Sequence, residues 1–182
     1  MAGWEPLLEE VARERYPRLV AYAMHLVGGR GDAEDLVQEA LVSTFSGRAR
    51  FASAAEAESY VRRAVASRYI DQGRRRTSER AALVRVGGEP GRDVEMPVPG
   101  LTSEVERALA GLSPRVRACV VLRHMDDLSV RETARTLRLS EGAVKRYVSD
   151  GVAALNAVLG TTVSVEQQLV VTDSGKAVRR GA

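Results

Sequence analysis

The chain has 182 residues, of which 45% are hydrophobic and 28% charged, and a formal net charge of +3. This is the composition of an ordinary folded protein, and no apolar run reaches the roughly 18 residues that a membrane span requires. A single cysteine, Cys119, excludes an internal disulfide. The first residues carry acids where a secretory signal needs basic and then apolar residues, so we expect a cytoplasmic protein without membrane contact.

Two helices are predicted at the start of the chain. Apolar residues at spacings of three and four indicate a helix over 4–27, with Pro17 as the point where it kinks or splits. A glycine pair at 28–29 ends it. Asp32 then fits the N-cap of a second helix, which ends at the break over 47–51.

A third helix is predicted over 54–73, because Ser53 and Glu56 have the spacing of a capping box. Its inward side chains are expected to be Tyr60, Val61, Ala64, Val65 and Tyr69. Its other face forms a basic stripe, which we call the arginine stripe: Arg62, Arg63, Arg68, Arg74, Arg75 and Arg76. Such a stripe suggests contacts with nucleic-acid phosphates and strongly salt-dependent binding, although cations also suit a solvated helix end.

The chain therefore divides into segments, and we predict an all-α fold of two small helical domains joined by a flexible linker. Glycine and proline punctuate residues 77–100, which we interpret as the linker between domains at 1–76 and 101–160. In the second domain, Ser113 before Pro114 is typical of a helix start. The tail, 161–182, has alternating apolar residues, and we hypothesise that it packs on the second domain or on a partner.

A helix-turn-helix is predicted in the second domain, where "SVRETARTL" and "EGAVKRYVSDGVAAL" are joined by "RLS". In this motif the second helix enters the major groove of DNA, while the first contacts phosphates. The candidate DNA-contacting residues are Arg131, Arg135, Glu141, Lys145, Arg146 and Ser149. Small helical bundles also contain such helix pairs without binding DNA. The turn position that glycine often holds is Arg138, where a left-handed backbone costs on the order of 1 kcal/mol.

Acidic residues cluster in "RGDAEDLVQEAL", residues 30–41 of an otherwise basic chain. Asp32 and Asp35 lie one helical turn apart and could converge on a metal ion, but a cap and a favourable first-turn charge explain them better. The commonest explanation of such a run of acids is a solvated helix face. A more specific hypothesis is a docking surface for another protein. We find no set of nucleophile, base and orienting group, and we expect no metal, no cofactor and no enzymatic activity.

Taken together, these segments resemble the extracytoplasmic-function (ECF) group of bacterial sigma factors, in the sigma-70 family. "YPRLVAYAMHLVGGRGDAEDLVQEAL" and "SYVRRAVASRYIDQGRRR" are similar to that family's region 2. "LSPRVRACVVLRHMDDLSVRETARTLRLSEGAVKRYVSDGVAALNAVLG" is similar to its region 4. The resemblance covers residues 4–76 and 101–160.

This resemblance implies a factor that binds core RNA polymerase and directs it to promoter DNA, without catalysis of its own. Asp35, Gln38 and Glu39 match positions that face the polymerase. The arginine stripe matches the helix beside the −10 element, and the helix-turn-helix residues match the −35 element. The resemblance also admits an anti-sigma factor as a partner. Ala66-Ser67 stands where the family often has Arg-Asn.

Two other functions compete with this interpretation. One is an ordinary helix-turn-helix regulator, which would bind its operator without polymerase. The other is a metal-dependent enzyme that uses the acidic cluster, in which case changing Asp32 or Glu39 would abolish a turnover.

Overall fold

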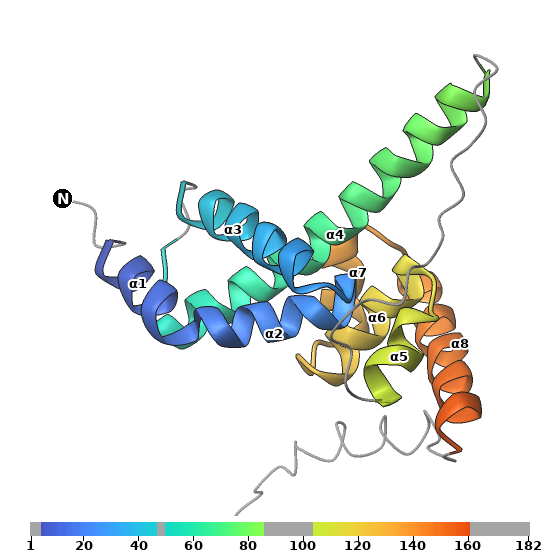
Figure 1. The fold of residues 1–182 in the computed structure, drawn as a ribbon. Helices are drawn as coiled ribbons and strands as arrows, with labels where there is room; N and C mark the ends of the chain where they lie inside the picture. The colour runs from blue at the N-terminus through green and yellow to red at the C-terminus, as the bar shows by residue number, and fades with distance from the viewer. Residues whose placement is uncertain (1–4, 47–49, 86–103, 161–182) are drawn as a thin grey trace, which may run out of the picture.

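The computed structural model describes residues 5–46, 50–85 and 104–160. Every secondary-structure element in these ranges is helical, which confirms the predicted all-α class. The elements are α1 (Glu5–Glu10), a π-helical segment η1 (Val11–Arg15), α2 (Tyr16–Val27), α3 (Arg30–Ser46), α4 (Ala54–Arg85), α5 (Glu104–Ala110), α6 (Pro114–His124), α7 (Val130–Leu137) and α8 (Glu141–Leu159). The helices before the undescribed stretch at 86–103 form the first unit, and α5–α8 form the second (Figure 1).

The first predicted helix is present but is split, as expected at Pro17. Proline has no backbone N–H and its ring displaces the carbonyl four residues earlier, so a regular helix cannot continue through it. The chain passes through the π-helical η1 immediately before α2, which has Pro17 in its first turn. Gly28 then ends α2 with a positive φ of 82°, a conformation that glycine adopts without strain.

The prediction that Asp32 caps α3 is wrong. The helix begins two residues earlier, at Arg30, and the Gly29 carbonyl accepts a hydrogen bond from the Ala33 N–H at 3.0 Å. The short turn that Gly28 permits brings the backbone into helical geometry before Asp32 is reached. Asp32 is therefore an exposed acid in the first turn, where its charge favours the positive end of the helix.

The third helix is longer than the sequence pattern predicted. α4 runs to Arg85 and not to Gly73, so residues 77–85 of the predicted linker are helical, while 86–100 lie outside the described residues. Glycine inside a helix costs only about 1 kcal/mol, and the arginines, glutamate and alanines that follow favour helix. Figure 1 shows the carboxyl-terminal part of α4 projecting away from the rest of the molecule.

The second unit follows the predicted helix boundaries closely. Pro114 opens α6 directly after Ser113, and Gly160 ends α8 in the left-handed conformation. At the centre of this unit Gly151 of α8 lies against α6, where an added Cβ would come within 2.5 Å of the Val120 side chain. Cys119 is buried in the same layer, and burial raises the pKa of its thiol to about 12. It therefore serves as a small apolar side chain, as predicted.

The two units pack against each other. α2 contacts α5 and α6, and α4 contacts α6 and α7, so α2 and α4 form the surface on which the second unit rests (Figure 1). The buried apolar side chains of both units form one contiguous cluster. Across the described residues, no helix is long and apolar enough to cross a membrane.

Candidate polymerase and nucleic-acid interfaces

The helix-turn-helix is formed by α7 and α8, and local hydrogen bonds fix both helix starts. Ser129 and Glu132 form the predicted capping box, in which each side chain bonds the other residue's backbone N–H. Ser140 accepts a hydrogen bond from the Ala143 N–H at the start of α8. Arg138 ends α7 with φ 53° and ψ 50°, so the left-handed arginine predicted in the turn is present.

All six helix-turn-helix residues singled out in the sequence are exposed: Arg131, Arg135, Glu141, Lys145, Arg146 and Ser149. The last four lie on the amino-terminal half of α8, the part of a recognition helix that enters a DNA groove. Arg146 also lies over the ring of Tyr147 at 5.2 Å, and hydrogen bonds with Arg115 and Arg146 lower the pKa of that tyrosine. This face is preformed and accessible.

The acidic cluster lies on the outer side of α3. Asp35, Gln38 and Glu39 are exposed. The opposite face of the helix, which includes Leu36, Val37 and Ala40, is buried, and α3 packs against α2 and α4. The surface continues along the helix to Val42, a large apolar side chain that is 67% exposed. A shallow hollow on this face is lined by Asp35, Gln38, Glu39, Val42, Ser43, Ser46 and Arg68. A polar rim around an exposed apolar residue is a common composition for a protein-binding surface.

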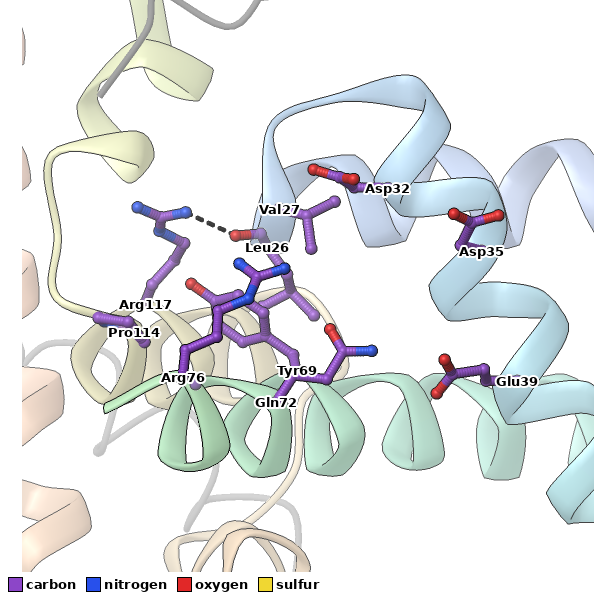
Figure 2. Close-up of a pocket in the computed structure, with 11 residues that line it drawn as sticks. Leu26, Val27, Asp32, Asp35, Glu39, Tyr69, Gln72, Arg76, Pro114 and Arg117 are labelled. Atoms are coloured by element: carbon purple, nitrogen blue, oxygen red, sulfur yellow. Dashed lines mark hydrogen bonds between the residues drawn. The ribbon is translucent and has the colours of Figure 1, made fainter. Parts of the chain in front are cut away.

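Figure 2 shows a second pocket beside this face, bordered by α2, α3, α4 and α6, with Leu26 and Val27 of α2 among the lining residues. Asp32, Asp35 and Glu39 come from α3, while Tyr69, Gln72 and Arg76 come from α4. Pro114 and Arg117 of α6 close it, and Arg117 donates a hydrogen bond to the Leu26 carbonyl. The three acids are spread along α3, and the described residues contain no group of three or more side chains able to hold a metal ion.

The arginine stripe is divided between internal pairs and exposed side chains. Arg75 and Arg76 are exposed, whereas the other four are half-buried. Arg68 pairs with Glu39 at 3.4 Å, and Arg74 lies 3.6 Å from Asp71 and donates to the Leu137 carbonyl. The sequence pattern could not separate these two groups, because Glu39 and the Leu137 carbonyl come from other helices.

Arg62 is less exposed than Arg68 and Arg74. One nitrogen bonds Glu58 at 2.8 Å, the other bonds Asp126 of the second unit at 3.1 Å, and the guanidinium lies 5.4 Å from the centre of the Tyr22 ring. Burial works against the charge on Glu58, yet hydrogen bonds and charges from Arg15 and Arg62 lower the pKa of that carboxyl. Sequence reasoning missed Glu58, Tyr22 and Asp126, since nothing local marks a contact between residues 64 positions apart.

An aromatic group lies at the amino-terminal end of α4. Phe51 contacts Phe45 at 5.8 Å and Tyr60 at 5.3 Å between ring centroids. Tyr60 is 42% exposed, so the prediction that it points into the core is wrong. The Arg63 guanidinium lies 5.8 Å from the Tyr60 ring, which adds a cation–π contact at the surface.

Comparison with known proteins identifies both units. The family model for sigma-70 region 2 matches residues 11–79, and the model for sigma-70 region 4 matches residues 102–155. The RNA polymerase sigma-E factor of Streptomyces avermitilis is 33% identical over 165 residues, which cover 87% of this chain and 89% of that protein. The ECF RNA polymerase sigma factor SigM of Mycobacterium tuberculosis is 31% identical over 88% of this chain and 81% of its own length.

A solved structure has the same fold. It is the sigma factor RpoE of Bartonella quintana, crystallised in complex with the anti-sigma factor NepR. It covers 85% of this chain and 97% of its own, with a TM-score of 0.58 and 21% sequence identity.

The chain therefore belongs to the ECF group of the sigma-70 family of RNA polymerase sigma factors. The resemblance first inferred from residues 4–76 and 101–160 is confirmed, and the function is that of a sigma factor and not of an independent regulator.

Proposed function

We propose that the exposed face of α3 binds core RNA polymerase, while α4 and the helix-turn-helix contact the −10 and −35 elements of promoter DNA. The observation that carries this assignment is the separation of two exposed faces of different charge. Asp35, Gln38 and Glu39 present acids and an amide on α3, and Lys145 and Arg146 present cations on α8. The basic face suits phosphates and guanine edges, whereas the acidic face repels DNA and suits a basic protein surface.

Within this proposal the protein acts by binding and not by catalysis. It works in the cytoplasm, where polymerase and promoters are found. The exposed arginines Arg75 and Arg76 supply phosphate contacts beside the −10 element, and Arg131 and Arg135 supply them beside the −35 element. Because a related fold was crystallised with an anti-sigma factor, we include an anti-sigma protein among the partners to be sought for this chain.

The test is transcription by core polymerase supplemented with this protein on total genomic DNA, followed by mapping of transcript 5′ ends. The proposal predicts discrete start sites that share two upstream sequence elements. Asp35→Ala with Glu39→Ala should reduce all such transcripts, and Lys145→Ala with Arg146→Ala should reduce those that depend on the upstream element. Start sites that are identical with and without the protein would contradict the proposal.

A further inference from the structure

Two hydroxyl residues follow the three consecutive arginines of the arginine stripe, in the sequence "RRRTS" at residues 74–78. The proposed function makes no use of these hydroxyls. Ser78, the second of them, is exposed, about two helical turns before α4 ends at Arg85. The carboxyl-terminal part of α4 projects away from the rest of the molecule (Figure 1). A second protein can therefore reach the Ser78 hydroxyl in the folded chain.

The surroundings of Ser78 are cationic. Positions three and four apart are neighbours on a helix surface, so Arg75 and Arg74 lie beside Ser78 on α4. Ser78 and Arg74 also line a hollow of about 560 Å³ together with Arg115, an exposed residue in the first turn of α6. The described lining of this hollow contains no carboxylate. A phosphate group attached to Ser78 would therefore find guanidinium partners and no like charge among these residues.

The arginines before Ser78 also form a recognition pattern for a protein kinase. Kinases select substrates by charge, and a kinase with carboxylates in its substrate groove binds arginines that precede the acceptor hydroxyl. Arg75 and Arg76 stand three and two positions before Ser78. A kinase binds this stretch in an extended form, and the exposed end of a helix opens locally at a small cost in free energy. Both the acceptor and its recognition residues are thus available.

We propose that Ser78 is a phosphorylation site for a serine/threonine protein kinase with an acidic substrate groove, and that the phosphate weakens binding of the arginine stripe to promoter DNA. The bond between the γ-phosphorus and the bridging oxygen of ATP breaks, and a bond between that phosphorus and Ser78 Oγ forms. ADP leaves, and the hydroxyl proton passes to a base of the kinase.

The consequence follows from the added charge, and it rests on the proposed function of α4. A phosphoserine carries about −1.5 to −2 charges at neutral pH. Beside Arg74 and Arg75 it pairs with guanidinium groups that would otherwise attract DNA, and it repels the DNA phosphates. Asp35, Gln38 and Glu39 lie on another helix, α3, so binding of polymerase should not change.

The first experiment identifies the acceptor. The full chain is incubated with MgATP and the catalytic subunit of cyclic-AMP-dependent protein kinase, which requires two arginines at these positions, and the product is mapped by tandem mass spectrometry. We expect phosphate on Ser78, lost in Ser78→Ala and retained in Thr77→Ala. The same phosphate should be found in protein isolated from its own cells with phosphatases inhibited. Absence of the phosphate from either preparation, or its presence on Thr77 alone, would overturn the proposal.

The second experiment measures promoter binding. Phosphorylated and unmodified protein are each combined with core polymerase, and a labelled promoter fragment is titrated at several salt concentrations. Phosphorylation should weaken promoter binding about tenfold and reduce its salt dependence, while co-sedimentation with polymerase is unchanged. Ser78→Asp should reproduce part of the loss. The control is Ala154→Asp, which adds the same charge at an exposed position on the carboxyl-terminal half of α8 and should cause no loss.

The outcomes separate this inference from the proposed function. Promoter affinity that is the same with and without the phosphate would overturn the inference, and so would an equal loss in Ala154→Asp, because net charge alone would then explain the effect. If the unmodified protein binds neither polymerase nor promoter, the proposed function is contradicted, whereas the mapping of Ser78 still tests the phosphorylation site.

Discussion

The helix-turn-helix and the arginine stripe are both basic, but they differ in how far their side chains are exposed to solvent or bonded to other helices. The six candidate residues of α7 and α8 all face solvent, and α8 is stabilised from its opposite side by α6. α4 packs against α2 and α3 of its own unit and against α6 and α7 of the second unit, so its arginines serve packing as well as surface charge. Arg62 and Arg74 bond to the second unit, while Arg75 and Arg76 are exposed. Positive charge on a helix therefore indicates a DNA surface only where no other element has taken up its donors.

The largest expected effect comes from the open surface. Lys145→Ala with Arg146→Ala should lower transcription from promoters with an upstream element about a hundredfold, because each well-placed base contact is worth about 1–3 kcal/mol. Polymerase affinity, measured by co-sedimentation, should not change. Arg107→Ala, which removes an exposed arginine of α5, is the matched control. An equal loss of polymerase affinity would show that the two faces are not separate.

The acidic face should be nearly as sensitive. Asp35→Ala with Glu39→Ala should weaken binding of core polymerase about thirtyfold, since truncating two interface residues that each contribute about 1 kcal/mol costs about 2 kcal/mol in total. Glu34→Ala on the same helix is the control, because it removes only the surface ion pair with Arg30. Polymerase affinity that falls equally in the control would place the binding face elsewhere on α3.

Packing in the second unit can be weakened without touching its surface. Gly151→Ala should lower the free energy of unfolding by about 1–3 kcal/mol, because its Cβ would press on the Val120 and Val116 side chains of α6. Gly142→Ala, near the start of the same helix and with open space around it, should be neutral or stabilising by about 0.5–1 kcal/mol. Chemical denaturation of the two variants measures the difference. A destabilised Gly142→Ala would contradict this packing account.

The smallest effect concerns the first helix of the helix-turn-helix. Ser129→Ala removes the capping box and should cost about 1 kcal/mol. Hydrogen bonds from Ser129 lower the pKa of Glu132 below its usual value of 4.5. Stabilisation from this carboxylate is therefore present above pH 4.5 and is lost as the pH falls through the lower, folded-state pKa. The stability difference between wild type and variant should shrink on acidification, and a constant difference would argue against this role for Glu132.

Local chemistry explains which features could be predicted from the sequence. Ser129, Ser140 and Gly160 each act within one helical turn, and the turn residue Arg138 was identified by its position between two helices. Gly73 was misleading, because a single glycine is too weak a signal to end a helix that arginine and alanine continue.

Contacts between distant segments could not be predicted in this way. Asp126 was one acid in a loop, and its partner lies 64 positions earlier in the chain. Likewise, nothing in the sequence marks the contact of the exposed Tyr60 with Phe51. The acidic face of α3 was recognised from its spacing, but the exposure of Val42 on that face required the structure.

The central claim is that the faces of α3 and α8 act together, through polymerase, on one promoter. The most direct measurement is an electrophoretic mobility shift on one mapped promoter fragment with this protein alone, with core polymerase alone, and with both. The account predicts a sequence-specific complex only when both are present, lost with Asp35→Ala plus Glu39→Ala. Tight, specific binding by the protein alone would contradict it.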